Sequence, residues 1–313
     1  MSPRDWRGLV ALTAMAVLFG ASFTAIKVAL GSFTPFQLVF LRFLISSASF
    51  ALLWPWIPKQ RLSRGDDARL FGLALLEPGL YFYAEAEGVK RTLASTAAVL
   101  ISTIPLFVLV LEALWLKVRI LLAEVLLILV SLGGIYLLVA AGPGAGLGGT
   151  ALGNGLILVS ALGASVYTVL AKKILATVHP LTLTFYQSLF AAGLYLPFAA
   201  ADTLRHTGPA PGRPAIAALL YLGVFCSFLA YALMNYSLSR MKASFAAAFA
   251  NLVPVVGIAL AYFALGERLV PVQLLGGAIV LTTMTALTLL APTHVEGEAD
   301  DLATKSPGKV GDS

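Results

Sequence analysis

Three ionisable side chains fall within apolar stretches of this sequence, where they could bind a charged solute or a proton. They are Arg42, Glu77 and Glu85. A charged side chain at the centre of a membrane-spanning helix costs roughly 2.5–3.5 kcal/mol, so such a residue is a functional candidate by default. Glu77 is the strongest candidate because Pro78 and Gly79 follow it, interrupt a helix and free backbone carbonyl groups.

Glu77 lies about eight residues into its predicted span, which places it roughly 12 Å deep, near the membrane midplane, at 1.5 Å per residue. A carboxyl group in an apolar environment favours its neutral form, so it can bind and release a proton as its surroundings change. We therefore predict that Glu77 binds substrate and responds to protons or cations. The alternative is a neutral or arginine-paired Glu77 that only holds helices together.

Arg42 lies about seven residues into its own span, roughly 10 Å from the outer end by the same rise. The next span runs in the opposite direction and brings Glu85 to a comparable depth and Glu77 somewhat deeper. We expect Arg42 to pair with Glu85 or with Glu77, because pairing lowers the cost of burying either charge. This pairing predicts a structural role for Arg42, and the alternative is that it binds a substrate carboxylate.

Uncharged polar groups complete the predicted site. Pro105 and Pro254 each remove a backbone hydrogen bond within a span, and Ser102 and Asn251 stand three residues before them. These two side chains could contact substrate where the helix is loosened, or they could bond a neighbouring helix instead. The remaining predicted substrate-binding residues are Ser22, Ser165, Tyr81 and Tyr167, and Tyr231 is a further candidate for lining a cavity.

Other notable residues have simpler interpretations. Glu112 and Lys27 lie near the ends of spans and are expected to extend toward water. The small residues at Ala243, Ala246, Ala247 and Ala250 are expected to let helices pack closely.

The composition explains where these residues must be positioned. Of the 313 residues, 59% are hydrophobic and 12% are charged, and the mean hydropathy is +0.91. Soluble domains have about 25% charged residues, so this chain cannot cover a water-facing surface. Apolar runs of 18 or more residues indicate membrane-spanning helices. Ten are predicted, over about 8–30, 35–54, 69–88, 92–116, 120–140, 152–172, 180–201, 214–238, 243–265 and 271–291. The first run continues past the length of a signal peptide, so we expect a retained helix.

The same composition argues against several kinds of chemistry. The net charge of +6 belongs to loops of a membrane protein, so nucleic acid is not an expected partner. Cys226 is the single cysteine, which excludes an internal disulfide. The three histidines are scattered through loops and the tail, so no metal site is predicted. No cofactor is expected either, because the chain has no nucleotide-binding glycine motif.

The chain consists of two similar halves. A constant shift of 149 residues relates Arg91 to Arg240, Ser95 to Ser244, Pro105 to Pro254 and further pairs between them. Gly20-Ala21-Ser22 in the first span is repeated as Gly163-Ala164-Ser165 in the sixth, and Pro35 at the start of the second span is repeated as Pro180. The predicted units are a first repeat over 1–140, a glycine-rich linker over 141–151, a second repeat over 152–291 and a disordered cytoplasmic tail over 292–313.

The distribution of basic residues predicts the orientation. With the N-terminus in the cytoplasm, the inner loops hold twelve basic residues and the outer loops hold five. The inner set is Arg4, Arg7, Lys59, Arg61, Arg64, Arg69, Lys117, Arg119, Lys172, Lys173, Arg240 and Lys242. Basic residues concentrate on the cytoplasmic side, so both termini are predicted to lie there. Because five is odd, the second repeat enters the membrane inverted relative to the first, which is a transporter architecture.

These halves resemble the EamA-type repeat of the drug/metabolite transporter superfamily over about 8–291. The supporting residues are Gly20 to Phe23, Leu41 to Ile45, Ala94-Ser95 before Pro105, Ala243-Ser244 before Pro254, and Gly266 to Leu269. The resemblance implies ten helices, both termini in the cytoplasm, and transport of small metabolites, amino acids or drugs through a central cavity. The family's glutamate after the fourth span is present as Glu267 in the second half, but Lys117 and Val118 stand at the equivalent first-half positions.

We therefore expect an all-α polytopic membrane protein of ten transmembrane helices, arranged as two inverted five-helix repeats. The expected function is secondary transport, with export of small metabolites such as amino acids, or of drugs, by alternating access. Proton coupling is left open, and the alternative is an uncoupled facilitator or exchanger. The expected location is the bacterial inner membrane, and the expected partners are a small-molecule substrate and membrane lipid. The sequence does not decide between a monomer and a weak homodimer.

Two other classes have less support. A membrane enzyme of lipid metabolism would need a metal-binding acidic cluster, and Asp66-Asp67 is the candidate pair, within a stretch that we interpret as a solvated turn. A non-transporting scaffold would fill the midplane with apolar side chains, which Glu77, Arg42 and Asn251 contradict.

Overall fold

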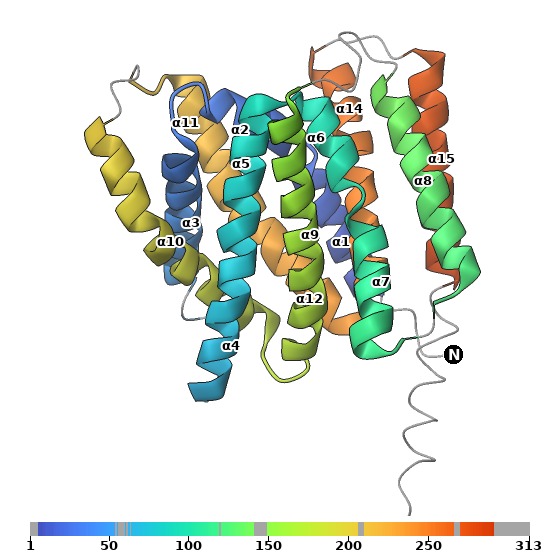
Figure 1. The fold of residues 1–313 in the computed structure, drawn as a ribbon, viewed down its shortest axis with the longest axis horizontal. Helices are drawn as coiled ribbons and strands as arrows, with labels where there is room; N and C mark the ends of the chain where they lie inside the picture. The colour runs from blue at the N-terminus through green and yellow to red at the C-terminus, as the bar shows by residue number, and fades with distance from the viewer. Residues whose placement is uncertain are drawn as a thin grey trace, which may run out of the picture.

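The computed structural model describes residues 6–53, 55, 60, 62, 64–118, 120–140, 149–205, 210–265 and 270–290. Within these ranges the helices line up as ten spans, numbered here in chain order (Figure 1). Spans 1 to 5 are α1–α2 (Trp6–Phe19, Ser22–Ala29), α3 (Pro35–Leu52), α4–η2–α5 (Arg64–Ala74, Leu75–Leu80, Tyr81–Arg91), α6–α7 (Ala94–Ile101, Ile104–Leu116) and α8 (Leu122–Ala140). Spans 6 to 10 are α9 (Ala151–Ile174), α10 (Pro180–Arg205), α11–η3–α12 (Arg213–Leu220, Tyr221–Ala230, Tyr231–Arg240), α13–η4–α14 (Ala243–Ala248, Phe249–Asn251, Leu252–Leu265) and α15 (Pro271–Leu290).

These spans confirm the predicted all-α fold. Five of them contain segments long and apolar enough to cross a membrane: Trp6–Ala29, Pro35–Leu52, Val99–Leu116, Ala151–Ile174 and Arg213–Arg240. The largest difference from the sequence prediction is at the start of span 3, predicted at 69 and found at Arg64. The interpretation of Asp66-Asp67 as a solvated turn was wrong, because both residues lie in the first turn of α4. Acidic residues there are favoured by the partial positive charge of a helix N-terminus.

One end of the bundle brings together the start of span 1 and the ends of spans 6 and 8. The Ser237 hydroxyl donates to the carbonyl oxygen of Gly8 at 3.0 Å. Lys172, near the end of α9, donates to the carbonyl oxygen of Leu238 at 2.9 Å. Span 1 therefore begins at the end of the bundle where span 6 finishes.

The opposite end brings together the end of span 1 and the start of span 6. Lys27, near the end of α2, donates to the carbonyl oxygen of Thr92 at 2.8 Å. The backbone N–H of Thr150, which precedes α9, donates to the carbonyl oxygen of Arg91 at 3.0 Å. Spans 1 and 6 consequently run in opposite directions, so the two repeats are inverted, as predicted.

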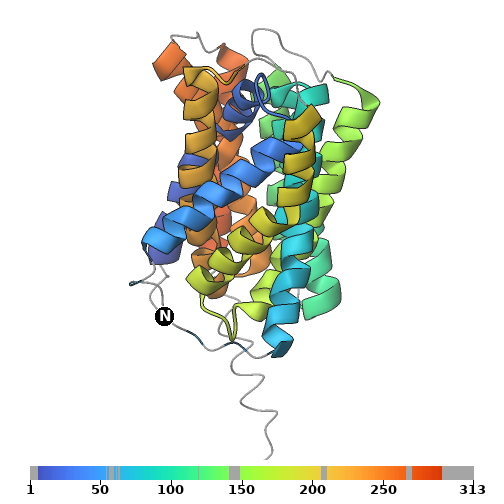
Figure 2. The ribbon, with the colours of Figure 1, turned by 90° about the vertical axis from the view of Figure 1, so that its left-hand side faces the viewer.

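The helix pairs follow this inverted symmetry. Span 5 packs chiefly on its counterpart, span 10, as α8 and α15 show at one side of Figure 1. Span 2 packs on its counterpart, span 7, where α3 crosses α10 obliquely (Figure 2). Span 3 contacts span 6 through α5 and α9, and the equivalent pair, spans 8 and 1, meets through α12 and α1. Each repeat is thus completed by contacts with the other.

Spans 3 and 8 both depart from a regular α-helix. Span 8 contains the π-helical stretch η3 over Tyr221–Ala230, whereas span 3 is kinked within η2 (Leu75–Leu80) by the extended backbone of Glu77. The 149-residue shift places this kink within η3. π-Helical turns are rare and often occur at functional sites. The kink and η3 both lie midway along their spans, where the two repeats meet.

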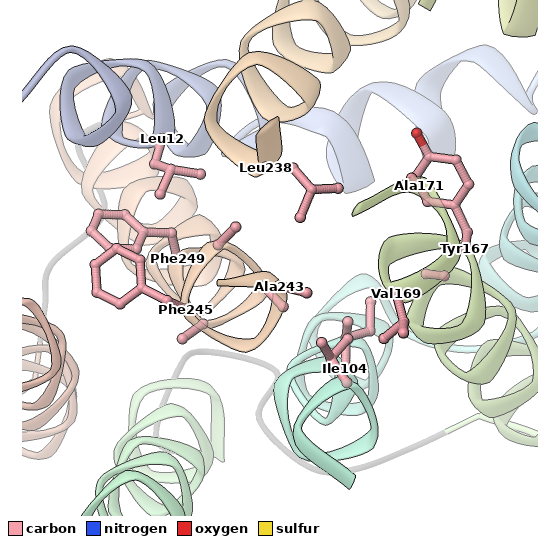
Figure 3. Close-up of a cluster of buried hydrophobic side chains, with 14 of the residues drawn as sticks. Leu12, Ile104, Tyr167, Val169, Ala171, Leu238, Ala243, Phe245 and Phe249 are labelled. Carbon is pink, nitrogen blue, oxygen red and sulfur yellow. The ribbon is translucent and has the colours of Figure 1, made fainter. Parts of the chain in front are cut away.

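The buried core also crosses between the repeats. Figure 3 shows Leu12 of α1 with Leu238 of α12 and with Phe245 of α13, while Ile104 of α7 lies near Val169 of α9. Tyr167 belongs to the same cluster and is fully buried. This shared core means that neither repeat has an independent apolar interior.

Glycine allows spans 1 and 9 to approach closely where span 1 is broken. A Cβ atom added to Gly257 would lie 2.7 Å from the carbonyl oxygen of Gly20, and one added to Gly20 would lie 2.6 Å from Cγ1 of Val256. A methyl group at Gly257 would therefore force backbone to move.

We expect Gly257→Ala to lower the free energy of unfolding by about 1–3 kcal/mol, because overpacking at a rigid contact displaces both helices. The control is Gly193→Ala in α10, where a Cβ atom would meet nothing within 4 Å. That substitution should stabilise by up to about 1 kcal/mol through helix propensity. Unfolding of the purified proteins in detergent measures both, and equal effects would contradict the close contact.

Candidate functional site

A cavity of about 100 Å³ lies between the two repeats. A water needs roughly 10–15 Å³ on this measure, so the space suits a small molecule. Its described walls come from spans 1, 2, 3, 4, 6, 8 and 9. The lining residues are Met15, Phe19, Ser22, Phe23, Ile26, Arg42, Glu77, Tyr81, Phe82, Glu85, Ile101, Ser102, Ile104, Ala164, Thr168, Tyr231, Met234, Leu238, Ala246, Ala247, Ala250, Val253 and Pro254.

Glu77 enters this cavity because span 3 is interrupted there. Its backbone is extended, with φ −144° and ψ 114°, as expected for a residue before proline. The carbonyl oxygens released by the interruption are bonded by span 7. The Gln187 amide donates to the carbonyl oxygen of Glu77 at 2.9 Å, and the Tyr195 hydroxyl donates to that of Gly79. The second repeat therefore holds the interrupted segment of the first.

The Glu77 carboxylate is 4% exposed, and its two oxygens have different surroundings. Oε1 accepts a hydrogen bond from the Tyr231 hydroxyl of span 8. Oε2 has no hydrogen-bonding partner among the described protein atoms. A buried carboxylate oxygen without a protein partner is costly, so this atom is a natural contact for a proton or a cationic solute.

Arg42 also lines the cavity and is bonded on several sides. Its Nε donates to Oγ of Ser227 at 2.8 Å, and its Nη1 lies 3.9 Å from Oε2 of Glu85. The guanidinium also lies over the ring of Phe82, at 4.3 Å from the centroid. Of the two partners that the sequence left open for Arg42, the structure places Glu85 in contact with it.

Tyr81 completes this group from α5. Its hydroxyl donates to Oε1 of Glu85 at 2.9 Å, so both oxygens of Glu85 face a polar partner. Glu85 is thus satisfied within the protein, whereas Glu77 is only half satisfied.

The predicted substrate-binding residues divide into two sets. Glu77, Tyr81, Ser22 and Ser102 line the cavity, as does Pro254 from the predicted helix breaks. Ser165, Tyr167 and Asn251 are buried outside its lining, and so is Pro105, which was predicted to be structural.

Packing accounts for the second set. The Ser165 hydroxyl donates to the carbonyl oxygen of Ala161 at 2.7 Å, one turn earlier in α9. Tyr167 contacts Gln187 and Asn235 through its hydroxyl, at 3.1 and 2.8 Å from their side-chain oxygens. These contacts join spans 6, 7 and 8 within the second repeat.

Asn251 is directed away from the cavity toward span 5. Its Nδ2 donates to Oγ of Ser131 at 3.1 Å, and its Oδ1 has no partner among the described protein atoms. Asn251 ends the 3₁₀ turn η4, whose three residues per turn rotate the side chain away from its position in a regular helix. Its sequence counterpart Ser102 lines the cavity instead.

Three residues around the cavity were not singled out for these roles. Ser227 accepts a hydrogen bond from Arg42, and Gln187 donates one to the backbone carbonyl oxygen of Glu77. Phe82 supplies the ring beneath Arg42. The sequence does contain a signal for Phe82, because the 149-residue shift pairs it with Tyr231, which was a candidate for lining the cavity. Ser227 and Gln187 carry no sequence signal beyond their polarity within apolar spans.

Glu112 does not extend to water, so that expectation was wrong. It is 3% exposed, and its two oxygens accept hydrogen bonds from the backbone N–H groups of Ala243 and Ser244, each at 3.0 Å. A carboxylate at a helix N-terminus is favoured by the partial positive charge there. Glu112 therefore ties span 4 to the first turn of span 9.

No group of three or more histidine, cysteine, aspartate and glutamate side chains that could hold a metal ion occurs within the described part of the chain.

Comparison with known proteins decides the family. The model of the EamA-like transporter family matches residues 6–140 and again residues 151–289. The chain belongs to the EamA-like transporter family. This family consists of transporters, so the chain is a multi-pass membrane transporter and not an enzyme.

Relatives of this EamA-like transporter match along most of its length. An uncharacterized transporter of Archaeoglobus fulgidus is 29% identical over 272 residues, covering 87% of this chain and 95% of its own. The uncharacterized inner membrane transporter YedA of Escherichia coli K12 is 27% identical, covering 89% and 90%. A probable terminal-alkyne amino-acid exporter of Streptantibioticus cattleyicolor is 26% identical, covering 86% and 89%.

A solved crystal structure has the same fold as this EamA-like transporter. It superposes with a TM-score of 0.75 at 20% sequence identity, covering 92% of this chain and 98% of the other.

Proposed function

We propose that this transporter is a secondary exporter of small metabolites, such as amino acids, or of drugs, and that it exchanges them for protons at Glu77. One observation carries the proposal. The buried carboxylate of Glu77 lines a cavity shared by two inverted repeats, and one of its oxygens has no hydrogen-bonding partner among the described protein atoms. Inverted repeats can open a shared cavity to either side in turn. The relative named as a probable terminal-alkyne amino-acid exporter supports export of amino acids.

The units that move would be the two repeats, over 1–140 and 152–291, joined by the linker at 141–151. Residues 141–148 of that linker and the proposed tail at 292–313 lie outside the described residues. The relative named as an inner membrane transporter supports a location in the bacterial inner membrane, with both termini in the cytoplasm.

Flux in proteoliposomes tests proton exchange. A gradient of one pH unit provides about 1.4 kcal/mol per proton, which supports a tenfold concentration ratio in one-for-one exchange. We expect the gradient to accelerate and concentrate a radiolabelled amino acid or drug selected from a panel. Glu77→Gln should abolish this response, because an amide cannot bind and release the proton.

The matched control is Glu87→Gln on the same span. Its carboxylate pairs with Arg91 and does not line the cavity, so the response to the gradient should persist. Flux that ignores pH in the unmodified protein would contradict proton exchange and favour an uncoupled facilitator. Absence of flux for every solute in the panel would contradict the exporter itself.

A further inference from the structure

The charges in the cavity wall do not balance. Among the described lining residues, the ionisable acid and base groups are Arg42, Glu77 and Glu85. Arg42 and Glu85 face each other at 3.9 Å and neutralise one another. An ionised Glu77 therefore leaves the wall with one unmatched negative charge. A solute with a single positive charge would cancel it, whereas a zwitterion would not.

A carboxylate on the solute would have to share Arg42 with Glu85. Nε of Arg42 donates to Oγ of Ser227, its Nη1 lies 3.9 Å from Oε2 of Glu85, and its guanidinium lies over the ring of Phe82. Drawing Arg42 toward a solute would remove the countercharge of Glu85, which is 4% exposed. An uncompensated buried charge is strongly unfavourable, so the existing pair opposes binding of an acid.

At the helix break in span 4, most backbone N–H groups are already bonded. Helix N-termini bind anions through free backbone N–H groups. At this break Thr103, Leu106 and Phe107 already donate to carbonyl oxygens of the same span, and Pro105 has no N–H group.

The break in span 9 is similar. The N–H group of Leu252 is bonded to carbonyl oxygens within η4, and Pro254 has none to offer. The N-terminus of α13 is occupied by Glu112.

Aromatic rings line the cavity next to the hydroxyl partner of Glu77. Tyr231, which bonds Oε1, lies edge-on to Phe19 with ring centroids 6.0 Å apart, and Phe82 lies 5.7 Å from Tyr231. Faces of such rings attract cations, and their edges and neighbouring aliphatic side chains suit an apolar body.

We propose that the cavity selects small organic amines that carry no carboxylate, with the ammonium group on Oε2 of Glu77 and the apolar body among Phe19, Phe82 and Tyr231. This proposal rests on the proposed function, because it names the class of solute that the same cavity would carry. Within the wider group of metabolites and drugs, it favours amines over amino acids.

Three ligands with the same phenylethyl body separate the alternatives: phenethylamine, phenylalanine and 3-phenylpropanoate. We expect phenethylamine to bind the purified protein in lipid nanodiscs at least about tenfold more tightly than the other two, as measured by calorimetry. Against 3-phenylpropanoate this factor corresponds to the low end for a hydrogen bond to a charged group. Against phenylalanine it reflects the cost of burying a carboxylate without a countercharge of its own. Glu77→Gln should remove the preference, and Glu87→Gln should retain it.

The result with the unmodified protein does not depend on any variant folding. Equal affinities, or tighter binding of phenylalanine, would overturn the amine assignment, and so would a preference that survives in a folded Glu77→Gln protein. Flux of phenylalanine without preference for the amine would leave the exporter standing and remove this inference. Selective amine binding without flux of any solute would contradict the exporter and leave the selectivity of the cavity for amines standing.

Discussion

Arg42→Met is expected to lower the free energy of unfolding by about 3–5 kcal/mol, because it leaves Glu85 as an uncompensated charge in the membrane interior. Glu85 is 4% exposed and Arg42 is 2% exposed, so bulk water does not screen the charge that is left. The methionine side chain retains much of the apolar stem, which isolates the effect of the charge. Titration of the purified protein from detergent into denaturing detergent measures the change.

A second substitution tests the cause of this effect. The double variant Arg42→Met with Glu85→Gln should recover at least half of the loss, because no buried charge then remains unpaired. Arg69→Met is the matched control, since Arg69 pairs with Asp66 at 3.6 Å and its side chain is 70% exposed. That change should cost less than about 1 kcal/mol. Equal losses at Arg42 and Arg69 would show that the buried pair does not stabilise the fold.

Glu112→Ala is expected to lower the free energy of unfolding by about 3 kcal/mol or more, because two buried backbone N–H groups lose a charged acceptor worth roughly 1.5–3 kcal/mol each. The groups belong to Ala243 and Ser244, at the first turn of α13. Glu112→Gln keeps one carbonyl oxygen and should give an intermediate loss. The same unfolding titration measures both variants.

Glu87→Ala serves as the control for Glu112→Ala. Glu87 pairs with Arg91 one turn along its own helix, with 13% of its side chain exposed, and pairs at this helical spacing contribute about 0.3–0.5 kcal/mol. Similar losses for the two glutamates would argue that Glu112 contributes no more than a pair within one helix.

The sequence predicts the spans well because their limits are chemical. Pro35, Pro180 and Pro271 each begin a helix, where the missing N–H group of proline has no cost. Arg91 and Arg240 each end one, at equivalent positions of the two repeats. The start of span 3 was missed because α4 extends beyond the apolar run into a charged segment. Hydropathy detects the apolar part of a helix and not its polar extension.

The candidate site is less predictable because depth along a helix does not give direction around it. The rise per residue places both Tyr167 and Tyr81 deep within their spans, yet only Tyr81 lines the cavity. The same uncertainty left Arg42 with two candidate partners. Contacts between distant segments, such as Glu112 with the start of α13 or Gln187 with the backbone of Glu77, depend on packing that no local pattern encodes.

The irregular turns in spans 3 and 8 bear on how the two repeats are related. The kink at Glu77 falls within the π-helical stretch of span 8 when the first repeat is mapped on the second. Duplication of one five-helix unit that already had an irregular turn at this position would account for both.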